Sequence, residues 1–591
     1  MKKYHALLLL ATFCFLFCAA NARADEGDPP TVAGRLSQAT GTVSIQPSGI
    51  NQWSAAGVNY PIATGDRFYA DQDGRAELEF GNAVARIWNN TDLTVTTLAD
   101  NQLQLGISQG DLHLRTQQIA STDLIEVDTP NGALTVVRPG DIRITIYPGD
   151  GGTGIAVYSG EITVSGPGLS EDVRAGQSIQ LAGTNPISAT LNAIGGPDDF
   201  DQWSSEEDQR WLDSRNGAYV NSEVPGYEDL GANGQWSADA NYGTVWYPAG
   251  VAADWAPYRY GHWVWSGPWG WTWVEDEPWG YAPFHYGRWV NLRGRWGWLP
   301  GPIFVRPVWS PALVAFVGGN GFSVGVGIGG VGLSAWFPLG PGEPYYPWYH
   351  CSPHYVDRVN IANIRSSRAV VVQKSYYSSD TSNVHYSYRT TGVTAVRSDN
   401  FANGKSVRQN IVNVDHNTLE HAQLIPHPEV APTARSLAPR PVNNLRVSNQ
   451  RPTLLTRGGQ QMQAVPGARP QPVPSSPRPP QNTSRSVVVP MNRAQPSQST
   501  GLVYRNEPRV AQPSFDRQQP ALNQHPGRPL EPQQVDNIRQ GRPAGPQRDV
   551  ESIPHAQPQP RSAPASRPSS HSAPPATQSK SSGHAKDDHH N

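Results

Sequence analysis

Cysteine and charged side chains are scarce in this sequence. Its 591 residues include 3 cysteines, and Asp, Glu, Lys and Arg together make up 16% of the chain. Two of the cysteines, Cys14 and Cys18, lie in an N-terminal segment that we expect to be removed. Only Cys351 then remains, so no internal disulfide is available and stability must come from packing. We expect Cys351 to be a small buried apolar residue.

Long apolar runs are also lacking, apart from one at the N-terminus. Lys2 and Lys3 precede the apolar run 6–20, and Ala22-Arg23-Ala24 has the small-x-small pattern of a cleavage site. The run is too short for a stable membrane span, so residues 1–24 are predicted to be a cleaved export signal. Lipidation at Cys18 is the alternative, although Phe17 stands where a small residue is needed. We therefore expect an exported chain, periplasmic or on the cell surface or secreted, without a transmembrane segment after cleavage.

The charge is distributed unevenly along the chain. Residues 425–591 contain 20 Lys and Arg against 9 Asp and Glu, a net charge of +11. Because the whole chain carries −3, the remainder carries −14. A basic segment joined to an acidic body predicts contact with anionic polymers or with the body itself. The alternative is that the arginines keep a disordered segment soluble. We expect no specific binding to nucleic acid.

Residues 33–195 have the pattern of short strands separated by turns. Gly110-Asp-Leu112-His-Leu114 and Gly160-Glu-Ile162-Thr-Val164 each place a glycine before alternating polar and aliphatic residues. That alternation is the period of a half-buried strand, and helical periodicity is absent. The segment is predicted to be an all-β sandwich or roll, called here the β-domain.

The β-domain resembles the FecR domain over roughly residues 35–183. The resemblance is carried by Gly65-Asp66-Arg67, Gly74–Leu78, Gly110-Asp111-Leu112, Val127–Gly132, Arg138–Asp141 and Gly160-Glu161-Ile162. The family prototype is a membrane-crossing regulator whose periplasmic part relays a signal to a sigma factor. This chain lacks the cytoplasmic helical segment and the membrane helix of that prototype, so the resemblance implies the β-domain but not direct sigma-factor control.

Residues 197–213 are predicted to be a single helix that links two modules. Phe200, Trp203, Trp211 and Leu212 are spaced for one helix face, and the acidic residues lie elsewhere on it.

Residues 224–415 are predicted to form a second β-rich module, called here the aromatic module. Of the 19 tryptophans, 15 lie between Trp236 and Trp348. Tyr260-Gly-His262-Trp263 recurs as Tyr286-Gly-Arg288-Trp289, and Trp269-Gly-Trp271 recurs as Trp296-Gly-Trp298. A repeat of this length indicates small hairpins pinned by aromatic pairs.

The aromatic module resembles a Tyr/Trp-rich domain of unknown function that often follows a FecR domain in exported bacterial proteins. The matching segments are Val224–Leu230, Tyr242–Pro248, Ala335–Glu343, Val359-Asn360 and Val393–Val396. The resemblance implies two modules and brings no activity with it.

Residues 425–591, called here the tail, are dominated by Pro, Gln, Ser, Arg and Ala. Such a composition buries too little apolar surface to offset the entropy of ordering, so the tail is predicted to be disordered.

Three motifs suggest chemistry but lack the context it needs. Gly106-Ile-Ser108-Gln-Gly110 fits a nucleophile elbow, yet Ser108 lies between β-segments rather than before a helix. The glycines of 325–330 have dinucleotide-binding spacing without a following helix. His350, Cys351 and His354 lack a fourth metal ligand. We therefore predict no cofactor, no metal site and no catalytic residue.

The Glu275-Asp-Glu277 segment lies among tryptophans, as a sugar-binding cleft requires. Aromatic rings stack on sugar faces, and carboxylates accept hydrogen bonds from hydroxyls. The candidate ligand-binding residues are Trp271, Trp273, Trp279, Tyr281, Trp289, Glu275 and Glu277. The alternative is that these aromatic residues form the core of a module that has no disulfides.

The sequence thus favours a non-catalytic envelope protein that binds a cell-wall glycan or another envelope polymer. Two alternatives stay open: a periplasmic sensor that acts through a protein partner in FecR-type signalling, and a hydrolase of cell-wall glycans. The oligomeric state and the ligand's identity are not determined by the sequence.

Overall fold

The structure is a computed structural model that describes ten stretches of the chain. They are residues 27–149, 151–213, 219–303, 305–318, 322–324, 331–363, 385–442, 453–457, 461–463 and 512–546. All of them belong to one compact unit, residues 1–547. The predicted export signal, the glycines of 325–330 and much of the tail lie outside the described residues.

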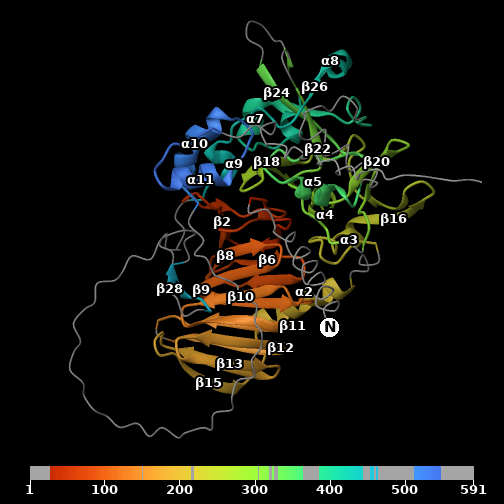
Figure 1. The fold of residues 1–591 in the computed structure, drawn as a ribbon. Helices are drawn as coiled ribbons and strands as arrows, with labels where there is room; N and C mark the ends of the chain where they lie inside the picture. The colour runs from red at the N-terminus through yellow and green to blue at the C-terminus, as the bar shows by residue number, and fades with distance from the viewer. Residues whose placement is uncertain are drawn as a thin grey trace, which may run out of the picture. The chain divides into compact units, whose positions relative to one another are not determined.

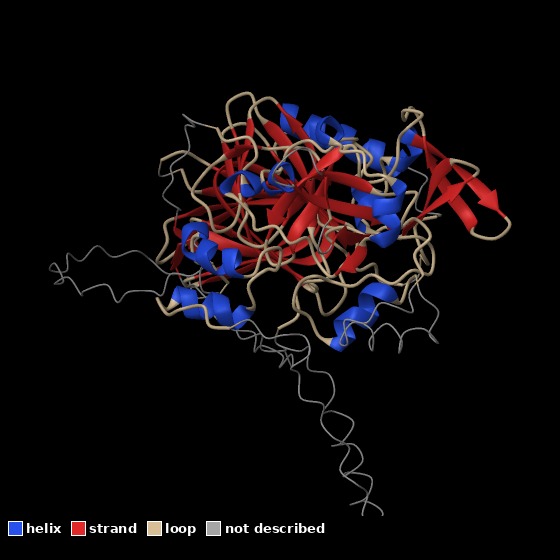
Figure 2. Cartoon of the chain, turned by 90° about the horizontal axis from the view of Figure 1, so that it is seen from above, coloured by secondary structure: helices blue, strands red, loops and turns tan. Residues whose placement is uncertain are grey.

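The described residues are mainly β, as the sequence predicted, and their helices are few and short (Figure 2). The strands of the β-domain are β1 (Gly34–Thr40), β2 (Val43–Gln46), β3 (Ser54–Ala55), β4 (Pro61–Ile62), β5 (Arg67–Ala70), β6 (Arg75–Glu79), β7 (Ala83–Ile87), β8 (Thr91–Ala99), β9 (Gln102–Thr116), β10 (Leu124–Thr129), β11 (Gly132–Ile146), β12 (Thr153–Gly166), β13 (Leu169–Arg174), β14 (Gln177–Ala182) and β15 (Ser188–Ala193). Pairing in this domain is antiparallel except where β9 runs parallel to β10.

The predicted alternation of polar and aliphatic residues does form the core of the β-domain. Leu112 and Leu114 on β9 and Ile162 and Val164 on β12 are buried in one aliphatic cluster. The glycines before them differ from the prediction, because they do not end strands. Gly110 and Gly160 adopt positive φ inside the long strands β9 and β12, which continue on either side (Figure 1). Glycine tolerates this conformation, so the strands continue instead of turning.

The predicted linking helix is present as α2 (Asp199–Asp213). Phe200 stacks on Trp88 of the β-domain with ring centroids 5.2 Å apart, and Trp203 is buried beside it. Trp211 is half-buried and packs against Tyr227, with ring centroids 6.2 Å apart. Leu212, by contrast, is exposed, so the predicted apolar face holds except at this residue. The carboxylate of Asp208 also receives a hydrogen bond from Arg86 at 2.8 Å, which fixes the helix to the β-domain.

The aromatic module contains several small sheets and short helices. Its elements are α3 (Leu230–Asn233), β16 (Gly234–Asp239), β17 (Gly243–Pro248), β18 (Gly261–Ser266), β19 (Gly270–Glu275), α4 (Tyr281–His285), β20 (Arg288–Leu292), β21 (Arg295–Leu299), β22 (Val314–Gly318), β23 (Ser323–Val324), β24 (Val331–Pro338), α5 (Pro353–Asn360), β25 (Thr394–Arg397), α7 (Ser398–Ala402) and η2 (Arg408–Asn410). Helix α8 (His416–His421) follows the module directly.

The repeat in the sequence corresponds to two hairpins, β18–β19 and β20–β21. In the first, Trp263 lies opposite Trp273. In the second, Trp289 lies opposite Trp298. Cross-strand aromatic pairs of this kind stabilise a hairpin whose strands are only five or six residues long.

The tail contains ordered segments, which differs from the prediction. They are α9 (Ala434–Leu437), β27 (Thr453–Leu455), β28 (Gln461–Gln463), α10 (Phe515–Gln524) and α11 (Pro532–Arg539), and β26 (Gln423–Ile425) lies just before them. The tail's few apolar residues explain the difference. Phe515 and Leu522 join the aromatic core, and Leu455 joins the aliphatic core. These isolated anchors are ordered by the folded body rather than by local periodicity.

A buried charge cluster around Arg35 joins the β-domain to the aromatic module. The Arg35 guanidinium donates to Asp229 at 2.5 Å and to the Pro278 carbonyl at 2.6 Å. It also lies 3.5 Å from the carboxylate of Glu79. Burial opposes the charge on Arg35, yet the neighbouring carboxylates raise its pKa above the usual value. Burial raises the pKa of Glu79 and of its hydrogen-bonded neighbour Glu228, and the nearby Asp229 carboxylate raises both further.

We predict that Arg35→Met destabilises the protein more at pH 8 than at pH 5. Without Arg35 the buried carboxyls lose their cation, and breaking such a pair costs about 3–5 kcal/mol. Their raised pKa means that the folded state binds protons, so the stability they contribute is present at low pH and lost as pH rises. Urea unfolding at the two pH values measures the difference. Arg138→Met is the control, because Arg138 is 72% exposed in its pair with Glu161. An equal loss at both pH values would contradict the prediction.

Candidate functional site

The predicted aromatic platform is buried in the core of the aromatic module. Its five rings are between 0% and 2% exposed: Trp271, Trp273, Trp279, Tyr281 and Trp289. They pack on one another and on their neighbours, for example Trp273 on Trp263 at 5.5 Å and Trp271 on Phe401 at 4.6 Å. A ring in such surroundings has no free face for a sugar. The platform interpretation is therefore corrected: these side chains are core residues.

The two acidic residues of the predicted site do not form a sugar-binding pair either. Glu275 is 2% exposed, and its carboxylate accepts a hydrogen bond from Trp273 Nε1 at 2.8 Å. Burial raises the pKa of Glu275 well above its usual value. Glu277 is half-buried, and its main-chain carbonyl accepts a hydrogen bond from Asn59 of the β-domain at 2.7 Å. The segment thus joins the two modules.

The remaining motifs have structural roles in the described part of the chain. Ser108 lies inside β9 and donates to Asp92 at 2.7 Å, so it does not stand at a strand-to-helix turn. Cys351 is buried, as predicted. Among the described residues, no three His, Cys, Asp or Glu side chains come close enough together to ligate a metal ion.

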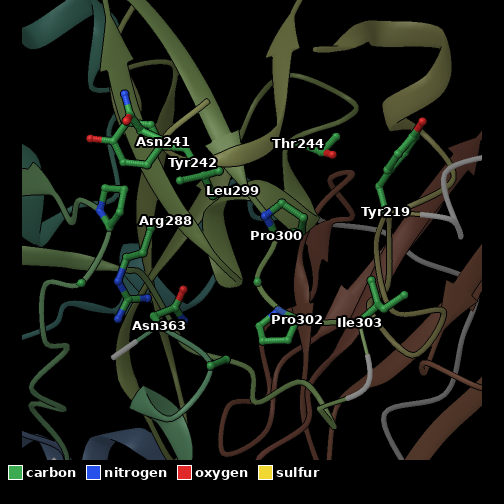
Figure 3. A pocket seen from close by; sticks show the side chains of 14 residues that line it. Tyr219, Asn241, Tyr242, Thr244, Arg288, Leu299, Pro300, Pro302, Ile303 and Asn363 are labelled. Atoms are coloured by element: carbon green, nitrogen blue, oxygen red, sulfur yellow. The ribbon is translucent and has the colours of Figure 1, made fainter. Parts of the chain in front are cut away.

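A cavity that the sequence did not predict lies at the edge of the aromatic module (Figure 3). Its volume is about 470 Å³, and its wall includes Tyr219, Asn241, Tyr242, Arg288, Pro300 and Asn363. Tyr219 and Tyr242 are 41% and 40% exposed, which leaves ring surface accessible. We call this cavity the Arg288 pocket.

Arg288 is a buried cation that makes no direct ion pair among the described residues, although the buried carboxylate of Glu343 is near enough to favour its charge. Arg288 is 1% exposed, and its Nε and Nη2 donate to the Glu343 carbonyl at 3.2 and 3.1 Å. Its Nη1 donates to the Gly287 carbonyl at 2.8 Å. These bonds use three of the five N–H groups of a guanidinium. Burial lowers the pKa of Arg288 to about 10.

The other deeply buried arginines show how unusual this arrangement is. Arg35, Arg67 and Arg86 each have a carboxylate within ion-pair distance. Among the described residues, no carboxylate lies within that distance of Arg288. The Glu343 carboxylate offsets only part of the cost of burying this charge, because burial still lowers the pKa of Arg288. An anion bound in the pocket would reduce the remaining cost. The pocket is therefore suited to a ligand that carries a negative group.

The repeat contained a signal that could have identified Arg288. Arg288 occupies the position that His262 holds in the first copy, at the start of the hairpin. His262 has Asp276 at 3.6 Å, whereas the second copy has no corresponding acidic partner. A charged residue at a repeated strand position without its acidic partner is thus a sign of a site. The distant Tyr219 and Asn363 carried no such signal.

Comparison with known proteins identifies the aromatic module alone. Residues 227–343 match a family of unknown function, DUF6600. This region contains Tyr242, Arg288 and Pro300 of the pocket. No curated protein sequence matches the chain.

Two crystal structures of a candidate anti-sigma factor from Parabacteroides distasonis ATCC 8503 share a distant likeness with this chain. Sequence identity is 13% and 12%, and the TM-score is 0.20 for both. The matches cover 25% of this chain and 63% and 64% of the other chain, less than two thirds of its length. A similarity this low carries no information on function.

We predict that Glu275→Gln increases the free energy of unfolding, relative to the wild type, by more at pH 8 than at pH 5. The raised pKa means that folding favours the protonated Glu275, so its contribution is present at low pH and lost as pH rises. The glutamine amide that replaces the carboxyl group stays neutral, and its oxygen can still accept the hydrogen bond from Trp273 Nε1. Urea midpoints at both pH values check this. Glu429→Gln, at an exposed position, is the control and is expected to shift neither midpoint. A gain that is independent of pH would contradict the prediction.

Proposed function

We propose that this chain is a non-catalytic, exported binding protein of the cell envelope whose Arg288 pocket takes an anionic segment of an envelope polymer. The observation that carries the proposal is the buried Arg288, which has no direct ion pair in the described part of the chain, in the wall of a cavity flanked by exposed tyrosine rings. A guanidinium suits planar anions such as carboxylates, to which it can donate two parallel hydrogen bonds.

The pocket also suits a ligand with apolar faces next to its charge. Tyr219 packs against Trp236 at 4.8 Å, which holds its ring in place, while one face stays accessible. Rings of this kind can stack on a sugar, and Asn241 and Asn363 supply amide groups for hydroxyls. A glycan that bears carboxylates, as peptidoglycan does through its peptide stems, has both features.

Location in the envelope is supported by the sequence of the first 24 residues, with its positive start, apolar run and small-x-small site. None of the helices in the described ranges has the length and apolarity needed to cross a bilayer. The resemblance of the β-domain to FecR is compatible with an extracytoplasmic role. We propose binding rather than hydrolysis because Arg288 and the tyrosines supply no acid–base pair for glycan cleavage.

The proposal predicts that substitutions in the pocket weaken binding to a soluble disaccharide–tetrapeptide of peptidoglycan. Arg288→Lys keeps a charge but loses the planar fork, and we expect at least a tenfold rise in Kd, from about 1.5–3 kcal/mol. Tyr242→Ala removes one ring, and we expect a rise of roughly fivefold, from about 1 kcal/mol. Isothermal titration calorimetry on the full mature chain measures both.

Two matched variants serve as controls for this experiment. Arg295→Lys lies on the partner strand β21 and faces Tyr247 instead of the pocket. Tyr147→Ala removes an equally exposed tyrosine from the β-domain. Because Tyr242 is exposed, its loss leaves the core intact, which tryptophan emission verifies. Unchanged affinity in Tyr242→Ala and Arg288→Lys would overturn the proposal.

A further inference from the structure

A short stretch of the tail crosses the β-domain at the point where two of its strands separate. Strand β9 pairs with β10 only as far as Gly106 opposite Asp128. One residue further along β10, Thr129 pairs instead with Leu455 of β27. Residues 453–457, called here the strap, therefore fill the opening that β9 leaves beside β10, and Figure 1 shows β28 next to β9.

The opening has a notch shaped for a leucine side chain. A Cβ at Gly106 would lie 2.6 Å from Cδ1 of Leu454, so a side chain at this position would have to displace the end of that leucine. Leu454 and Leu455 are both buried, and Leu455 joins the aliphatic core of the β-domain. The glycine that begins the Gly106-Ile-Ser108-Gln-Gly110 motif thus provides space for a side chain from the tail.

The floor of the opening carries two buried carboxyls. Glu126 and Asp128 lie two residues apart on β10, and Gln104 donates to them at 3.3 and 2.8 Å. The main-chain N–H of Arg457 in the strap donates to Glu126 at 3.4 Å. Acidic groups that meet main-chain N–H groups favour an extended peptide over a negatively charged ligand.

We propose that this opening is a docking groove for an extended peptide segment, and that the strap of a second copy of this chain binds there in exchange with the chain's own strap. This segment, Thr453-Leu454-Leu455-Thr456, has two adjacent aliphatic residues and no acidic residue beside them. Main-chain pairing supplies affinity in such grooves, and the side-chain notch supplies specificity. The proposal concerns the β-domain and does not depend on the Arg288 pocket.

The groove binds its occupant more tightly in acid. Burial and the adjacent Glu126 raise the pKa of Asp128 well above its usual value. Asp128 therefore takes up a proton when the groove is filled, so occupancy of the groove is favoured at low pH and becomes less favourable as pH rises. The residues opposite the two acids on β9 and β11 are Gln104, Gly106, Ala133 and Thr135, and none of them titrates. The strap contributes one charged residue, the exposed Arg457.

The test is a peptide of residues 451–463, labelled with a fluorophore and titrated with the full mature chain while anisotropy is recorded. In a chain carrying Leu454→Asp and Leu455→Asp the strap leaves the groove. We expect the peptide to bind this strap-released chain at least tenfold more tightly than it binds the wild-type chain. Adding Gly106→Val fills the notch and removes this binding. Asp128→Asn in the same background removes the difference in affinity between pH 5 and pH 8.

Two controls make the outcome decisive. A peptide with the same two Leu→Asp changes does not bind any of the chains, and this control needs no folded variant. Leu191→Asp, at an exposed leucine of β15, leaves peptide binding at the wild-type level. Equal affinity of the wild-type and strap-released chains for the peptide, or binding that survives Gly106→Val, overturns the proposal.

Discussion

Burial of arginine charges determines how this chain is held together and where it can bind. Three deeply buried arginines pair with carboxylates, and the Arg35 cluster connects an aliphatic core to an aromatic one. The described residues contain a single cysteine, Cys351, so no disulfide joins these parts, and buried ion pairs and main-chain hydrogen bonds do so. Arg288 departs from this pattern, and the departure marks the pocket that we assign to an anionic ligand.

The sequence predicted those parts of the fold that depend on local periodicity. The alternation in Ile162-Thr-Val164 and the repeated Trp-Gly-Trp segments predicted strands and hairpins, because each needs only neighbouring residues to be recognised. It also predicted helix α2, whose Phe200 and Trp203 pack as one apolar face.

The site could not be predicted in the same way, because it depends on burial and on distant partners. Exposed and buried tryptophans look alike in a sequence, so Trp273 and Trp279 were equally compatible with a platform and with a core. Arg288 differs from Arg35 only in what surrounds it, and those surroundings come from segments far apart in the chain. The ordered parts of the tail were missed for a related reason: Leu455 and Phe515 are single anchors without periodic neighbours.

Binding of an envelope polymer in the Arg288 pocket is tested most directly by co-sedimentation of the mature chain with purified peptidoglycan, at low and at high salt, with an insoluble neutral polysaccharide for comparison. Salt screens exposed charges strongly and a buried guanidinium much less. We predict that the chain pellets with peptidoglycan but not with the neutral polysaccharide, and that pelleting persists at high salt. No pelleting, or pelleting that high salt abolishes, would contradict this prediction, since the latter would assign binding to the basic tail.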